Sequence, residues 1–149
     1  MRDCTTKHRS LEDDTICRIL REFRRIAVVG LSEKAWRPSY RVASYLMRQS
    51  YEVIPVNPGI KEVFGVKSFP NLVSAPGPIE VVDIFRRVEY IPAIVDEAIK
   101  IGSKAVWMQS GLADPASAGR ARRAGLLVVM DRCIMVEHEL HMQGTDREV

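Results

Sequence analysis

The sequence predicts an α/β domain of three layers, with a mostly parallel sheet of five or six strands lying between helices. Three observations lead to this fold class. Short apolar segments alternate along the chain with segments whose apolar residues recur at helical spacing. Several apolar segments are near-continuous, as in strands that are buried on both faces. Glycine, proline and polar turns separate the two kinds of segment, and this alternation is typical of βαβ units.

The first predicted helix covers residues 10–24. Its apolar residues lie at helical spacing, Ser10 is suited to the N-cap, and Asp13 follows three residues later. A near-continuous apolar strand is expected over 26–30.

A polar loop after Gly30 leads into a helix over 38–49. Pro38 suits the first helical turn, where a missing N–H is not a loss. The next strand, over 52–56, contains Pro55, which has no N–H to donate to a ladder. We therefore expect this strand near the edge of the sheet.

A turn at 57–59 and a short third strand within 63–69 come next. After a loop at 74–78, a near-continuous apolar strand is expected over 79–85. Asp83 lies inside that strand, where a carboxyl group is costly to bury without a hydrogen bond. We expect it to accept one from a nearby loop N–H.

The remaining elements are helices at 91–101 and 115–124, strands at 105–108 and 126–130, and a short helix after residue 131. Gly102 and Gly125 are expected to end the two longer helices. Asp114 is suited to the N-cap of the second of them, with Pro115 at its first position.

Length and composition favour one domain over residues 1–149, with flexible tails at about 1–9 and 142–149. The net charge of +3 is too weak for a dedicated nucleic-acid-binding protein, and basic and aromatic residues are not interleaved on one face. The longest apolar runs are far shorter than the roughly 20 residues of a membrane span, and the N-terminus lacks an apolar signal region. We expect a cytoplasmic protein without nucleic-acid or membrane partners.

Cysteine and histidine patterns predict neither a metal site nor a disulfide scaffold. Cys4, Cys17 and Cys133 are scattered and form no C-x-x-C pair. We also find no assembled set of nucleophile, base and orienting group, so no catalytic residue is predicted.

Polar or cationic residues follow four predicted strands, in the segments 30–39, 57–59, 86–87 and 109–111. Ligands of parallel α/β sheets bind outside the carboxyl ends of the strands. The first segment also joins a glycine turn to a helix N-terminus, where free N–H groups and the helix dipole attract anions. A phosphate-bearing ligand is therefore expected at this edge.

A nicotinamide dinucleotide is disfavoured as that ligand. Only Gly30 remains of the G-x-G-x-x-G fingerprint, and Val56 is followed by Asn57 where an acidic residue would hold the ribose. NAD(P) binding stays as the weaker alternative.

Five segments recur together, in this order, in one protein family: Val28 to Ser32, Arg37-Pro38-Ser39, Val56-Asn57-Pro58, Val82 to Arg87 and Met130 to Cys133. On these motifs the chain resembles the stand-alone CoA-binding domain proteins, which are similar to the N-terminal domain of the succinyl-CoA synthetase alpha subunit. The resemblance covers roughly residues 12 to 140. It implies a Rossmann-like domain that binds coenzyme A or an acyl-CoA without a demonstrated reaction of its own.

Together, the strand ends and the resemblance predict ligand contacts at Gly30, Leu31, Ser32, Arg37, Pro38, Ser39, Val56, Asn57, Pro58, Phe85, Arg86, Arg87, Gln109 and Gly111. The resemblance puts the pyrophosphate at residues 30–32. One of Arg86 and Arg87 is expected to meet a phosphate, while the other could pair with Glu89.

Two classes of function stay open. The chain is either a binding module, alone or as a homodimer, or the CoA-binding half of an acyl-CoA synthetase-like enzyme that a partner subunit completes. Cys133 is expected to be a small buried side chain, and a thiol facing the CoA sulfur is the alternative.

Overall fold

Five parallel strands form the central sheet of the computed structural model, which describes residue 4 and residues 10–142. Their order is β2-β1-β5-β6-β7. Their bounds are Arg25–Val29 for β1, Glu52–Val56 for β2, Val81–Ile84 for β5, Ala105–Met108 for β6 and Leu127–Val129 for β7. The predicted parallel α/β fold is therefore confirmed.

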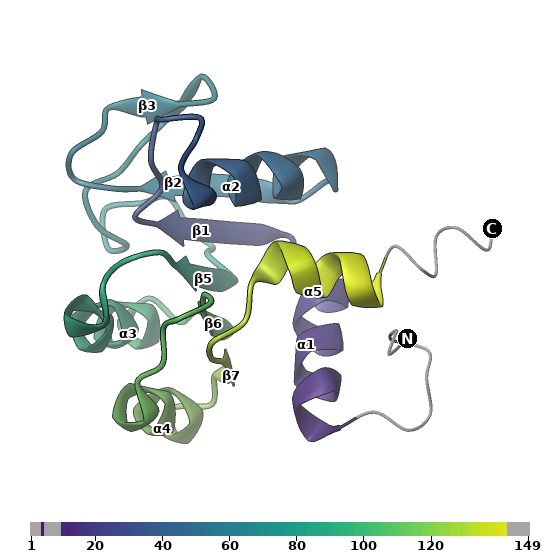
Figure 1. Cartoon of the computed structure of the whole chain (residues 1–149). Helices are drawn as coiled ribbons and strands as arrows, with labels where there is room; N and C mark the ends of the chain where they lie inside the picture. The colour runs from purple at the N-terminus through teal and green to yellow at the C-terminus, as the bar shows by residue number, and fades with distance from the viewer. Residues whose placement is uncertain (1–3, 5–9, 143–149) are drawn as a thin grey trace.

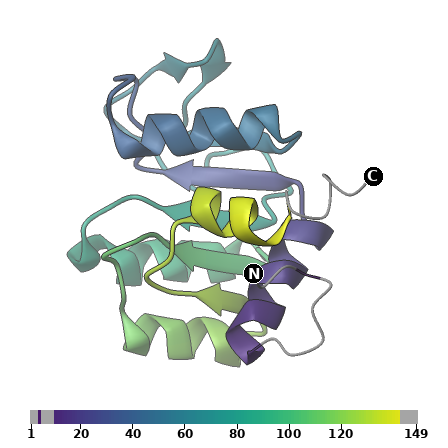
Figure 2. The same ribbon diagram turned by 45° about the vertical axis from the view of Figure 1, so that its right-hand side comes forward.

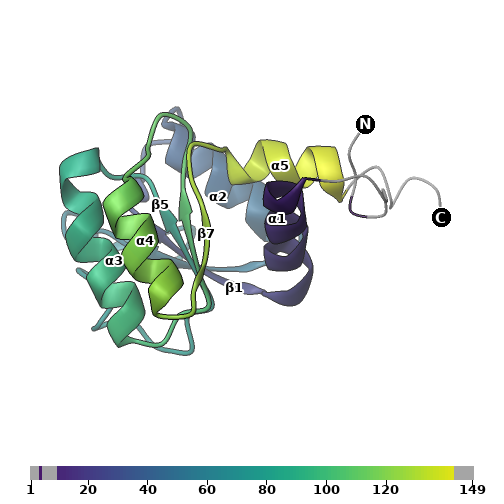
Figure 3. The ribbon, with the colours of Figure 1, turned by 90° about the horizontal axis from the view of Figure 1, so that it is seen from below.

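Helices cover both faces of the sheet (Figures 1 and 3). One layer contains α1 (Leu11–Glu22), α2 (Pro38–Arg48) and α5 (Ile134–His141). The other contains α3 (Ile91–Lys100) and α4 (Pro115–Arg123), and a short 3-10 helix, η1 (Val88–Tyr90), leads into α3. The bounds agree with the predicted helices to within a few residues.

Alternating side chains of the strands fill two apolar cores, one on each side of the sheet. Val28 and Trp107 belong to the core under α1, α2 and α5. Their neighbours Ala27 and Val106 belong to the core under α3 and α4. Since both faces are buried, the strands need apolar residues at successive positions, which explains their near-continuous apolar runs.

Of the two predicted N-cap residues, one makes the capping hydrogen bond and the other does not. Ser10 caps α1, and its hydroxyl accepts a hydrogen bond from the Asp13 amide at 3.0 Å. Asp114 occupies the N-cap position of α4 without bonding a backbone amide. Its carboxylate instead accepts a hydrogen bond from the Ser117 hydroxyl.

The segment predicted as a short third strand is a hairpin outside the main sheet. Its strands are β3 (Glu62–Val63) and β4 (Val66–Lys67), which pair antiparallel. The two residues between them, Phe64 and Gly65, have φ angles of 57° and 72°. Positive φ at both central positions is the geometry of a tight hairpin turn, so the chain reverses where one strand was expected.

The β2 strand lies at the edge of the five-stranded sheet, as Pro55 predicted. Phe69 lies alongside the end of β2, because its amide donates to the Pro55 carbonyl at 3.0 Å and its carbonyl accepts from Asn57. This contact returns the hairpin segment to the sheet.

A disulfide bond joins Cys4 to Cys17 of α1, a bond that the cysteine pattern, which indicated no disulfide scaffold, did not predict. Most of the two predicted tails lies outside the described residues. Cys4 is buried, and Met142 is the C-cap of α5. None of the helices formed by residues 10–142 combines the length and apolar character needed to span a membrane.

Candidate functional site

Gly30 makes the turn at the carboxyl end of β1. Its φ angle is 89°, and a Cβ built on it would lie 2.7 Å from the Phe85 carbonyl oxygen and 2.9 Å from Cδ of Arg86. The Gly30 amide donates to the Val56 carbonyl at 2.8 Å. A side chain is therefore excluded at the point where the ends of β1, β2 and β5 meet.

The loop after Gly30 folds back on the N-terminus of α2. The Ser32 amide donates to the Ser39 hydroxyl at 3.0 Å, and the Lys34 amide donates to the Ser32 hydroxyl at the same distance. Arg37 is the N-cap of α2 and makes no side-chain capping bond, and the first turn has no acidic residue. The positive end of this helix is thus free of a neutralising carboxylate within that turn.

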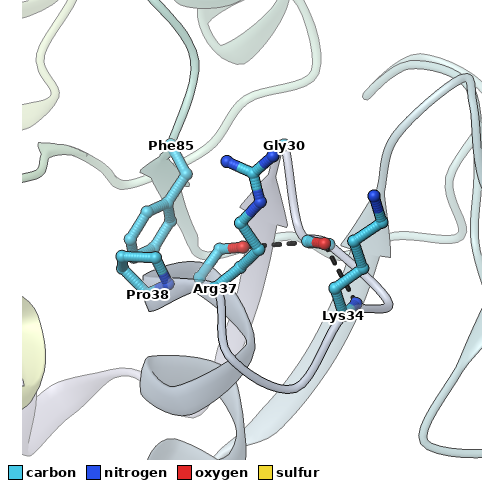
Figure 4. Close-up of a pocket in the computed structure, with 7 residues that line it drawn as sticks. Gly30, Lys34, Arg37, Pro38 and Phe85 are labelled. Atoms are coloured by element: carbon cyan, nitrogen blue, oxygen red, sulfur yellow. Dashed lines mark hydrogen bonds between the residues drawn. The ribbon is translucent and has the colours of Figure 1, made fainter.

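A cavity of about 410 Å³ lies in front of this loop, lined by Gly30, Ser32, Lys34, Arg37, Pro38, Ser39 and Phe85. Figure 4 shows the Arg37 and Lys34 side chains extending from the loop on the same side, with the Pro38 and Phe85 rings next to each other. In Figure 2, the β1 arrow points to this edge, where α2 begins. The first cavity combines two cations with two hydroxyl groups, a composition that suits phosphate.

A second cavity, of about 450 Å³, shares Pro38 and Phe85 with the first. Its other lining residues are Val42, Arg86, Arg87, Gln109, Ser110, Leu112 and Cys133. Apolar surface predominates in this lining. The two cavities therefore adjoin at Pro38 and Phe85; cations line both, and the second is the more apolar.

A third cavity, of about 170 Å³, lies at the ends of β2 and β5. Val56 and Pro58 line it from the end of β2, and Tyr90 and Ile94 line it from η1 and α3. Arg86 belongs to both the second and the third cavity.

The two adjacent arginines have different surroundings. The Arg86 guanidinium lies 4.2 Å from the centre of the Tyr90 ring and is half-buried. The Arg87 side chain is 77% exposed and has its Nε 3.9 Å from a Glu89 carboxylate oxygen. Arg86 is therefore the better placed of the two for a ligand between the cavities.

Eleven of the fourteen predicted contact residues line the three cavities. The other three, Leu31, Asn57 and Gly111, are absent from these linings. Leu31 has its side chain in the core, and the Asn57 amide donates to the Leu31 carbonyl at 3.1 Å. The Gly111 amide donates to an Asp131 carboxylate oxygen at 2.7 Å. Asn57 and Gly111 thus shape the loops.

Gln109 has a structural role in addition to lining the second cavity. Its side-chain oxygen accepts from the Ile134 amide at 3.1 Å and so holds the first turn of α5. Only 4% of Gln109 is exposed.

Sequence reasoning did not place Val42, Leu112, Tyr90 or Asn71 at the site, although they line cavities. Val42 is one turn after Pro38 on α2, so helical spacing from a predicted contact could have identified it. Tyr90 follows Arg86 across a turn and a 3-10 helix, where no such spacing applies.

Asp83 is fully buried on β5, between Val28 and Trp107 of the neighbouring strands. Its two carboxylate oxygens have no hydrogen-bond partner among the described residues, so the expected bond to a loop N–H was wrong. Burial raises the pKa of the Asp83 carboxyl well above its ordinary value. Asp83 therefore favours its neutral form in the folded protein.

Comparison with known proteins gives a consistent result. Residues 24–139 match the protein family described as CoA binding domain. An uncharacterized protein of Bacillus subtilis is 40% identical over 120 residues, which are 80% of this chain and 89% of that protein. The acetate–CoA ligase (ADP-forming) II of Archaeoglobus fulgidus is 24% identical over 97 residues, which are 63% of this chain but 14% of the ligase.

Among solved structures, a hypothetical protein from Pyrococcus horikoshii is 38% identical, with a TM-score of 0.84 over 91% of this chain and 97% of that one. An acetyl-coenzyme A synthetase of Candidatus Korarchaeum cryptofilum shares the fold at 24% identity, with a TM-score of 0.63 over 70% of this chain and 25% of the synthetase.

Proposed function

Because the chain belongs to the CoA-binding domain family, we propose that it binds coenzyme A, or an acyl-CoA, at the carboxyl edge of its sheet. The observation that carries this proposal is that the family match over residues 24–139 contains every residue that lines the three cavities. Family membership and the location of the cavities therefore point to one site.

Each cavity suits one part of coenzyme A. The pyrophosphate lies in the first cavity, against Ser32, Ser39 and the Arg37 end of α2, where cations and the helix dipole stabilise its charge. The pantetheine arm runs through the apolar second cavity toward Cys133. The adenosine end lies near Val56 and Pro58 in the third cavity.

We propose that the protein acts as a cytoplasmic binding module and not as an enzyme by itself. Cys133 lines the second cavity as a free thiol. Within the described residues, no hydrogen bond joins that thiol to a histidine or a carboxylate that could activate it. A complete nucleophile and base would be needed for covalent catalysis.

A second role is supported by the similarity to part of an ADP-forming acetate–CoA ligase. In this role the chain is the CoA-binding half of a synthetase, and a partner subunit supplies the remaining chemistry. An assay for ADP formation from ATP, acetate and CoA distinguishes the roles. Activity that appears only after a candidate partner subunit is added supports the synthetase role, whereas activity of the chain alone contradicts the binding-module proposal.

The direct test uses the ribose 3′-phosphate, which coenzyme A has and dephospho-CoA lacks. We expect the wild-type protein to prefer coenzyme A, and Arg86→Ala to remove most of that preference. A lost hydrogen bond to a charged group costs about 1.5–3 kcal/mol, or about ten- to a hundredfold in affinity. Calorimetric titrations of each protein with coenzyme A and with dephospho-CoA measure this preference.

Arg87→Ala is the matched comparison, because Arg87 also lines the second cavity but is 77% exposed and lies beside Glu89. It should keep the preference. If wild-type protein gives no heat with millimolar coenzyme A, the proposed function is wrong. If Arg86→Ala binds coenzyme A and still separates the two ligands, the assignment of the arginine is wrong and Arg37 becomes the candidate.

A further inference from the structure

A second group of chemically reactive side chains lies outside the cavities, where α1 meets the end of α5 (Figures 1 and 3). The Cys4 and Cys17 sulfurs and one His141 ring nitrogen lie within 4.8 Å of one another. The exposed fractions of these residues are 5%, 2% and 2%. Two sulfurs and an imidazole together form a donor set for a thiophilic metal ion.

His141 is oriented as a metal ligand should be. Its Nδ1 lies 3.8 Å from Sγ of Cys17, and its Nε2 lies 3.3 Å from a Glu137 carboxylate oxygen. In the tautomer protonated at Nε2, that nitrogen donates to the carboxylate and the Nδ1 lone pair faces the sulfur. A carboxylate behind the imidazole is the usual outer partner of a metal-bound histidine.

The groups around Nε2 of His141 make further ionic contacts. Glu137 Oε2 lies 3.8 Å from an Arg132 guanidinium nitrogen, and Asp13 Oδ1 lies 3.8 Å from His141 Nε2. These groups limit the rotation of the imidazole. The acidic groups thus lie on the Nε2 side of the ring, and Nδ1 faces Sγ of Cys17.

We propose that the reduced pair Cys4 and Cys17 binds Zn²⁺ together with Nδ1 of His141, and that the disulfide is the metal-free form of the same site. Zinc bonds to sulfur and nitrogen are about 2.3 and 2.0–2.1 Å long. In a tetrahedral site these lengths put the two donor atoms about 3.5 Å apart. The 3.8 Å between Cys17 Sγ and His141 Nδ1 is close to that span. Water takes the fourth position.

Reduction of the disulfide and binding of zinc convert the metal-free form into the metal-bound form. Two molecules of a low-molecular-weight thiol supply two electrons and two protons to the Cys4–Cys17 bond and become a disulfide themselves. Zn²⁺ then displaces the two thiol protons to solvent, and two zinc–thiolate bonds form. Thiols of cytoplasmic proteins are kept reduced, so the metal-binding form is the one expected in that compartment.

The site has a route of entry. A cavity of about 440 Å³ is lined by Cys17 and by the polar residues Asp14, Arg18, Arg21 and Glu22 of α1. It brings solvent to the Cys17 side of the cluster, whereas the proposed CoA site lies at the carboxyl edge of the sheet. Metal binding and CoA binding can therefore be measured separately.

The test measures bound metal in the full chain. The protein is reduced with a phosphine, equilibrated with Zn²⁺, separated from free ion by gel filtration and analysed by atomic emission. We expect one zinc ion per reduced chain and none per oxidised chain. Co²⁺ in place of zinc should give a thiolate-to-metal charge-transfer band and the intense visible bands of a tetrahedral site.

Cys17→Ser and His141→Ala should lose the metal, while Cys133→Ser, which removes the third cysteine, should retain it. Glu137→Gln should keep one zinc ion and bind it about 10- to 100-fold more weakly. Reduced wild-type protein that holds no zinc, or a Co²⁺ form without the charge-transfer band, overturns the proposal. So does zinc retained by a folded Cys17→Ser variant. If that variant does not fold, the wild-type cobalt spectrum still decides.

Discussion

Gly30 has the strictest local requirement at the proposed CoA site, because both its positive φ and the space around it exclude a side chain. We expect Gly30→Ala to destabilise the protein by about 1–3 kcal/mol through backbone strain alone. The clash with the Phe85 carbonyl adds to this cost and displaces the loop. CoA affinity should fall at least tenfold, measured by calorimetry on the folded fraction.

Gly125 provides a matched control for that experiment. Its φ is 93°, and a Cβ there has no neighbouring atom within 4 Å. Gly125→Ala should therefore show the backbone strain without the clash and keep wild-type CoA affinity. Equal losses of affinity in both variants would contradict the role assigned to Gly30.

Asp83 predicts a specific dependence of stability on pH. Burial raises the pKa of its carboxyl in the folded state, whereas in the unfolded chain that pKa is near 3.9. Between these two pKa values, the folded protein keeps a proton that the unfolded chain has released. The stability that this proton contributes is fully present below about pH 3.9. That contribution is lost as pH rises toward the folded-state pKa.

Asp83→Asn removes the titration while keeping the shape of the neutral carboxyl. The variant should gain stability relative to wild type as pH rises from 4 to 8, as measured by urea unfolding at several pH values. Glu139→Gln, which removes an exposed carboxylate in place of the buried one, is the matched control. If the stability of Asp83→Asn and of wild type changed with pH in parallel, the raised pKa assigned to the buried Asp83 carboxyl would be wrong.

The sequence indicated which residues lie at the cavities better than it indicated which bonds their side chains make. Gly30, Ser32 and Ser39 were expected at a ligand site, and all three line the first cavity. Asn57 and Gln109 were expected to contact the ligand as well, and their side-chain amides bond to backbone atoms of other segments, although Gln109 also lines the second cavity. Such a partner depends on loops that are distant in sequence, which a local motif does not reveal.

At the scale of elements, the pattern of apolar residues predicted the helices and strands whose side chains are buried. The five strands of the sheet are buried on both faces, so their apolar runs were visible, and Pro55 correctly indicated the edge position of β2. The β3–β4 hairpin was missed because each strand has only two residues, too few for a pattern. Its turn depends on positive φ at Phe64, a residue that gives no such indication.

The Cys4–Cys17 disulfide could not be predicted because the two residues belong to different segments, and only Cys17 lies in a recognisable helix. Pairing also involves the end of α5, because the Cys4 amide donates to the His141 carbonyl at 3.2 Å. A contact between residues so far apart in sequence has no local signal.

At the scale of the whole molecule, strand order creates the site. The strands β1 and β5 are neighbours, although β2 and the hairpin lie between them in sequence. This order brings the Gly30 loop against Phe85 and Arg86, as the parallel α/β class predicted for the carboxyl edge. The sizes and chemical character of the three cavities depend on packing between loops and could not be predicted from motifs.

The central claim is that this site selects coenzyme A over a nicotinamide dinucleotide. The most direct measurement is the melting temperature of wild-type protein with equal concentrations of CoA and NAD. A ligand at about 100 times its Kd stabilises the native state by about 2.7 kcal/mol, which raises Tm by several degrees in a chain of this size. CoA should produce this shift, and NAD should leave Tm unchanged. Equal shifts with the two ligands, or no shift with millimolar CoA, would contradict the account.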